Sequence, residues 1–134
     1  MIGMDIYRVL SSEPSITDIV GNRIYPVNGR ETDIPCIIYE VGSPVIEETY
    51  DEGAVQLASI NFTVSCVAKT YAESQTLYNN VMKLMVDYAD PDDGRIQRVM
   101  YDGTVNEDNY IDPELDNVAW YDVVISFRAW FYWK

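Results

Sequence analysis

The sequence predicts an α+β fold in which a four-stranded, mainly antiparallel sheet carries one long helix across a face. Residues Gln56 to Ala68 alternate apolar and polar side chains, which is typical of a strand with one buried face. A stripe with helical spacing follows this run, and two more strand-like runs complete the chain. With 134 residues and 48% apolar content, the chain is long and apolar enough for one domain, which we place at residues 1–134.

Short helices are expected ahead of the sheet. Residues Met4 to Ser11 put their apolar side chains on one side, and Ser15 is the predicted N-cap of a second helical turn that stops at Gly21. Arg23 to Pro26 should be extended, because a residue that precedes proline avoids the helical region. The N-terminus lacks the basic and apolar regions of a signal peptide, and no run approaches the ~20 apolar residues that span a bilayer.

The first two strands should be separated by an acidic loop. Cys36 to Val41 is an apolar run bounded by Pro35 and Gly42, and it is the first predicted strand. The second is the alternating run that ends at Ala68. Its predicted core side holds Ala58, Ile60, Phe62, Val64, Cys66 and Ala68, and the loop before it holds Glu47, Glu48, Asp51 and Glu52.

The long helix begins at a capping box, in which Thr70 and Glu73 each accept from a first-turn N–H. We expect the helix to run to about Ala89, because Pro91 lies just beyond. Its predicted buried stripe recurs at steps of three and four residues and consists of Leu77, Tyr78, Val81, Met82, Leu84, Met85 and Tyr88.

A third strand is predicted at Arg95 to Asp102, an acidic loop at Gly103 to Asn117, and a last strand at Val118 to Trp133. The acidic loop holds Glu107, Asp108, Asp112, Glu114 and Asp116. If both strand–strand connections are hairpins, the simplest sheet has the order 1-2-4-3 with its two longest strands in the centre.

Nothing in the sequence indicates catalysis. The chain has no histidine, which removes the commonest general base and metal ligand, and it has no nucleotide-binding or nucleophile motif. The acidic segment Asp90 to Gly94 lacks the ligand pattern of a calcium loop and is better explained as a turn after a helix. Cys36 and Cys66 lie in apolar runs and should be reduced and buried. We therefore expect no enzyme activity, no cofactor and no metal.

The charge is strongly negative. The chain has 9 Lys and Arg against 22 Asp and Glu, a net charge of −13, and should repel nucleic acid and anionic membranes. The charge has two explanations: it keeps the protein soluble, or it lets a surface stand close to DNA without binding it.

Aromatic side chains concentrate on the last strand. Trp120, Trp130 and Tyr132 share one side of it, Trp133 follows, and such residues dominate the energetics of interfaces. They are the candidate sites of self-association or partner contact. The alternative is that the N-terminal helix covers this side within one subunit.

Several segments together resemble a known family. They are Ser15 to Pro26, Asp33 to Glu40, Val64 to Ala68 and the capping box at Thr70. In their order and spacing they resemble the tail terminator proteins of long-tailed bacteriophages, also known as tail completion or head–tail joining proteins. The resemblance covers the chain from about Asp5 to Phe131.

The resemblance implies a virion structural protein of the tail or neck, assembled in the host cytoplasm. Six copies would form a ring that caps the tail tube, binds the head connector or head completion protein, and lets DNA pass without specific binding. The aromatic C-terminus departs from the family pattern and suggests a contact of this protein's own. The residues expected to line an acidic lumen are Glu47, Glu48, Asp51, Glu52, Glu107, Asp108, Asp112, Glu114 and Asp116.

A second function class remains open at this point: an acidic inhibitor that mimics DNA and blocks a DNA-binding host enzyme. A mimic needs carboxylates spaced like phosphates over a large face, whereas here they concentrate in two predicted loops. This distribution favours the ring.

Overall fold

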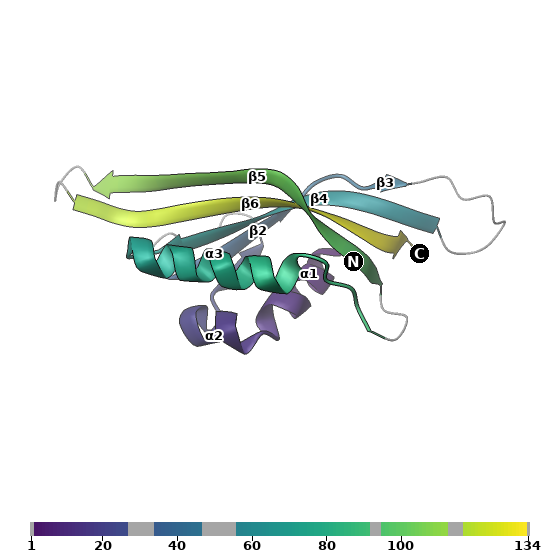
Figure 1. Ribbon diagram of the computed structural model, residues 1–134, viewed down its shortest axis with the longest axis horizontal. Coiled ribbons are helices and arrows are strands. Elements are labelled where there is room, and N and C mark those ends of the chain that lie inside the picture. The colour runs from purple at the N-terminus through teal and green to yellow at the C-terminus, as the bar shows by residue number, and fades with distance from the viewer. Residues whose placement is uncertain (1, 27–33, 47–55, 92–94, 113–116, 134) are drawn as a thin grey trace.

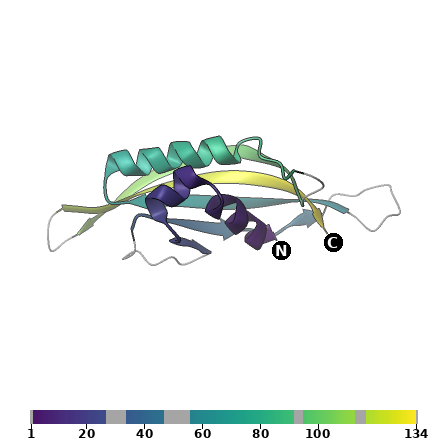
Figure 2. The same ribbon diagram turned by 90° about the horizontal axis from the view of Figure 1, so that it is seen from below.

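The computed structural model describes residues 2–26, 34–46, 56–91, 95–112 and 117–133. In these residues a sheet of six strands carries three helices, all on one of its faces (Figures 1 and 2). None of the described helices is long and apolar enough to cross a membrane. In chain order the elements are α1 (Ile2–Ser11), α2 (Pro14–Val20), β1 (Ile24–Pro26), β2 (Cys36–Val41), β3 (Val45–Ile46), β4 (Gln56–Ala68), α3 (Tyr71–Met85), β5 (Ile96–Asp112) and β6 (Asn117–Trp133).

The prediction of a four-stranded, mainly antiparallel sheet is wrong. The described strands form a mixed sheet in the order β1-β2-β4-β6-β5, with β3 paired to β4 beside β2. β1 lies parallel to β2, with Ile24 opposite Ile37, although its residues were expected only to be extended. Strands of two or three residues are too short to show a period of two, so the sequence pattern does not reveal β1 and β3. Among the four longer strands the neighbours are β2-β4-β6-β5, which places β5 at an edge.

β5 also differs from its prediction, because the expected acidic loop from Gly103 is mostly strand. β5 continues to Asp112 and pairs with β6 along its length, with Val105 opposite Ile125 and Asp108 opposite Asp122. The register shifts between Tyr101 and Val105, and Gly103 within this shift has a φ of 81°, which glycine adopts without strain. The polar residues from 102 to 109 break the apolar alternation, which is why this part of the sequence resembles a loop.

The helix α3 begins where the capping box predicts. The Thr70 hydroxyl accepts a hydrogen bond from the Glu73 N–H at 3.2 Å. The helix ends at Met85 rather than near Ala89, because the next residues take up extended and left-handed conformations. The chain then runs beside β5, where Val99 accepts from the N–H of residue 87 and donates to the carbonyl of Tyr88, both at 2.9 Å.

The N-terminal helices follow the prediction with one correction. α1 begins at Ile2, somewhat earlier than expected, and buries Ile6, Val9 and Leu10. The N-cap of α2 is Glu13 rather than Ser15. Its carboxylate accepts from the N–H of residue 15 at 3.4 Å, and Pro14 occupies the first helical turn.

The core lies between the sheet and the three helices. The six residues predicted to form the core side of β4 are all buried, and so are the odd-numbered residues of β6 from Val123 to Phe131. Both cysteines are buried, as predicted, and neither is in a disulfide bond. Burial raises the pKa of the Cys66 thiol, and the charges of Asp122 and Cys36 add to this effect. Both effects disfavour the reactive thiolate form at neutral pH.

Candidate interaction surface

The face of the sheet turned away from the helices is the candidate site, and we refer to it as the open face. The N-terminal helices were one candidate to cover it, but Figures 1 and 2 show α1, α2 and α3 together on the other side. Strand alternation and register place two rows of side chains on the open face. They are Leu57, Ser59, Asn61, Thr63, Ser65 and Val67 from β4, and Trp120, Asp122, Val124, Ser126, Arg128, Trp130 and Tyr132 from β6.

The predicted aromatic residues do not form one cluster. Tyr132 is 40% exposed, and Trp130, two residues away on the same side of β6, is half-buried. Trp120 lies near the other end of β6, ten residues from Trp130, which is roughly 30 Å along a strand. Trp133 belongs to β6, but its side chain lies outside the described part of the chain. Of the three predicted interface residues whose side chains are described, Trp130 and Tyr132 lie together and Trp120 lies apart.

Arg128 is a residue of this face that the sequence reasoning did not single out. Its Nη2 donates to the Ser59 hydroxyl at 2.7 Å and its Nη1 to the Asn61 side-chain oxygen at 3.5 Å. Its guanidinium carbon lies 5.4 Å from the centre of the Trp130 ring, within cation–π range. The alternation of β6 could have indicated an arginine among aromatics. The contacts to β4, however, depend on the strand register, which the sequence pattern leaves open.

The predicted acidic residues are only partly described. Glu107 and Asp108 are exposed, but they lie on β5 rather than in a loop. Glu107 is opposite Val123 on the helix side and accepts a hydrogen bond from Gln75 at 2.9 Å. Asp112 is in the same strand without a described side chain. The remaining six residues, Glu47, Glu48, Asp51, Glu52, Glu114 and Asp116, lie outside the described residues.

Asp108 and Asp122 face each other across β5 and β6. Burial and, to a smaller extent, the charge of Asp108 together raise the pKa of Asp122 to about 6. The Asp122 Oδ1 atom is buried and has no hydrogen-bond partner among the described residues. Like charges directly opposite one another destabilise a strand pair, so this part of the sheet favours a proton or a cation.

Two of the shallow hollows among the described residues lie against the sheet, one on each side, and contain polar residues. One crosses the open face between Glu40 and Asp102, and the other lies between the start of α3 and the β5–β6 hairpin, beside Tyr71 and Glu107. In the described residues no three His, Cys, Asp or Glu side chains come together as a metal-binding group would require.

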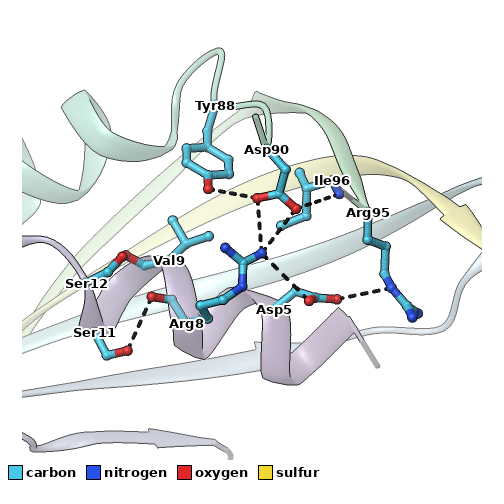
Figure 3. Close-up of polar contacts among 9 residues, drawn as sticks. All are labelled: Asp5, Arg8, Val9, Ser11, Ser12, Tyr88, Asp90, Arg95 and Ile96. Carbon is cyan, nitrogen blue, oxygen red and sulfur yellow. Dashed lines mark hydrogen bonds and ion pairs between the residues drawn. The ribbon is translucent and has the colours of Figure 1, made fainter. Parts of the chain in front are cut away.

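Asp90 is the centre of a polar cluster that ties α1 to the segment before β5 (Figure 3). Its carboxylate accepts from Arg8 at 3.0 and 3.1 Å, from the Tyr88 hydroxyl at 2.8 Å and from the Ile96 N–H at 3.0 Å. Asp5 extends the cluster, with its carboxylate oxygens 3.7 Å from Arg8 and 3.5 Å from Arg95. The residues after it, 92–94, lie outside the described part of the chain, so the predicted turn at Asp90 to Gly94 is only partly visible.

This cluster holds Asp90 ionised. Burial alone opposes the charge, but the hydrogen bonds from Ile96, Tyr88 and Arg8 outweigh it and lower the pKa of Asp90 below its usual 3.8. Among the described residues, four hydrogen bonds from groups of the same chain reach its carboxylate, and its side chain is only 4% exposed. Asp90 is therefore a structural carboxylate that fixes α1 against the sheet, rather than a binding group.

Comparison with known proteins gives a likeness of fold. No family model matches the sequence, and neither does any curated protein. A chain in the solved structure described as "Virion of native gene transfer agent (GTA) particle" is similar, with a TM-score of 0.61 and 14% sequence identity. The match covers 96% of this chain and 92% of that chain. Since the identity is low, the likeness shows a shared fold.

Proposed function

We propose that this chain is a non-enzymatic structural protein of a phage or phage-like virion. The observation that carries the proposal is the fold likeness to a chain of a gene transfer agent virion, which extends over 96% of this chain and 92% of that one. A match of nearly the full length on both sides favours a shared role over a shared supersecondary motif. The buried carboxylate of Asp90 is occupied by contacts within the fold, which is consistent with a structural role.

Within a virion, we propose a place at the end of the tail tube. The segments that resemble tail terminator proteins support this position, as does the open face, where Trp130 and Tyr132 are available for contacts between copies. The partners would be other copies of the chain in a ring of six, the tail tube protein and the head connector. A net charge of −13 per copy would keep DNA in the lumen from adsorbing.

Purified protein mixed with tail tubes that lack a terminator tests this proposal. Native mass spectrometry should give the copy number, and negative-stain images should show a ring at one end of each tube and no effect along its sides. Tubes that remain bare, or a hydrolase or nuclease activity that persists through repurification, would contradict the proposed function.

A further inference from the structure

We propose that Arg128 anchors a contact between copies of this protein, in which it binds the Asp108 carboxylate on the β5–β6 hairpin of a neighbouring copy. The inference rests on the proposed function, since it names the residues through which the copies meet. It adds a specific pair to the aromatic contacts, and this pair sets the orientation of one copy on the next.

Arg128 is held in place by its contacts within the sheet, and these contacts leave some of its N–H donors available for another acceptor. A guanidinium carries five N–H donors in a rigid fork, and the contacts of Arg128 on this face are to two neutral oxygens, those of Ser59 and Asn61. The Trp130 ring lies against the group at 5.4 Å and restricts its rotation. An arginine ordered in this way loses little entropy when a carboxylate binds its remaining donors, which can engage both carboxylate oxygens at once.

Arg128 also lacks a carboxylate partner, whereas three of the other described arginines have one, and Arg23 instead donates to two backbone carbonyls. Arg8 pairs with Asp90, Arg95 with Asp5 and Arg98 with Asp87. No carboxylate lies within 4.0 Å of Arg128 among the described residues. In a chain with 22 acidic and 9 basic residues, an ordered arginine on the open face is complementary to the surface of another copy.

The hairpin offers the carboxylate that such an arginine needs. Asp108 is exposed, lies on the same side of the sheet as Arg128, and is oriented by the N–H of Asn109, which donates to its Oδ1 at 2.8 Å. Asp122 faces it, and in the described residues neither carboxylate has a cation within 4.0 Å. An arginine from outside would relieve the repulsion between them. Figure 1 shows the hairpin extending past the N-terminal end of α3, where a neighbouring copy can reach it.

The two groups cannot meet within one copy. Asp108 pairs with Asp122, which lies six residues before Arg128 on the same strand, a separation of roughly 20 Å. Arg128 and Asp108 can therefore pair with each other only when they belong to different copies. The contact removes Asp108 from the residues proposed to line the lumen, whereas Glu107, on the opposite side of the strand, is unaffected.

Matched charge reversals test the anchor. Arg128→Glu should raise the dissociation constant of self-association about tenfold or more in sedimentation velocity, and should reduce ring formation on tail tubes. Lys83→Glu is the control, because Lys83 is exposed in the last turn of α3, on the other side of the sheet, and it should leave assembly unchanged. Arg128→Lys keeps the charge but loses the planar fork, so it should recover only part of the association. Circular dichroism establishes that each variant is folded.

A charge swap identifies the carboxylate. Arg128→Asp combined with Asp108→Arg should restore assembly, whereas Arg128→Asp combined with Glu107→Arg should not, because Glu107 lies on the other side of the strand. Asp108→Arg alone, at an exposed position, should weaken assembly without affecting the fold.

The outcomes separate the two proposals. If wild-type protein forms no ring in solution or on tubes, the proposed function fails and the anchor with it. If wild-type protein assembles and Arg128→Glu assembles equally well, only the anchor is refuted. If Arg128→Glu assembles normally but binds tubes or DNA less well, Arg128 contacts a different partner and the inference is wrong.

Discussion

Asp90 illustrates how a single side chain holds two distant segments together. Its Arg8 contact joins α1 to the segment before β5, and we expect Asp90→Asn to lower the free energy of unfolding by about 2 kcal/mol at pH 7. Because the pKa of Asp90 is lowered on folding, its contribution is present above the unfolded value near 3.8 and is lost as pH falls through the folded value. Urea unfolding should therefore show the deficit at pH 7 and none well below pH 3.8.

The control for Asp90 is Asp87→Asn. Asp87 also pairs with an arginine, Arg98, but its side chain is 70% exposed, so the change should cost about 0.5 kcal/mol or less. Equal losses at the two positions would show that burial of the Asp90 cluster contributes nothing.

Asp122 should have the opposite pH dependence. Its folded pKa of about 6 lies above the unfolded value of 3.8, so folding favours the protonated form. The stability that the proton contributes is complete below the unfolded pKa and is lost as pH rises through about 6. Asp122→Asn should therefore stabilise the unassembled protein at pH 7 by up to about 1 kcal/mol and have no such effect below about pH 4. A benefit of equal size at both pH values would exclude repulsion from Asp108 as its cause.

At the scale of elements, the cap of α3 can be tested directly. Thr70→Ala removes the hydroxyl that accepts from the Glu73 N–H and should cost about 1 kcal/mol in chemical denaturation. Thr76→Ala is the matched control within the same helix, where the hydroxyl donates to the carbonyl of Ala72 and alanine has the higher helix propensity. It should be neutral or stabilising. A loss as large as that of Thr70→Ala would mean that the cap has no special role.

The elements that could be predicted are those whose own residues carry a periodic apolar pattern or a capping motif. The alternation of β4 and the cap of α3 predicted where these elements begin. Burial of one side of a strand or helix repeats apolar residues at a fixed spacing, and this spacing can be recognised in the sequence. The second half of β5 was missed because its backbone is held by β6, while its own side chains from 102 to 109 are mostly polar. The same holds for the candidate site. The alternation of residues along β6 predicts on which side of the strand Trp130 lies, but the contact between Arg128 and Ser59 depends on the register between β4 and β6, which the sequence does not reveal.

For the whole molecule, charge decides the expected behaviour toward DNA. With a net charge of −13, the protein should show no measurable binding to duplex DNA at physiological salt, because contact brings phosphates close to carboxylates. A fluorescence anisotropy titration over a range of salt concentrations measures this. A dissociation constant below about 1 µM that weakens with salt would reveal a basic surface and contradict an acidic lumen.

Assembly of the whole ring should depend on Trp130. Six copies of this charge repel one another, so contacts that exclude water must outweigh the repulsion, and Trp130 is a half-buried aromatic beside Arg128 on the open face. Trp130→Glu should weaken each interface by on the order of 2 kcal/mol and release folded subunits, as measured by native mass spectrometry and tail-tube binding. Tyr71→Glu, which changes a 57% exposed aromatic on the helix side, should assemble normally. If Trp130→Glu and the milder Trp130→Ala both unfold the subunit, the tryptophan belongs to the core of one copy and cannot be an interface anchor.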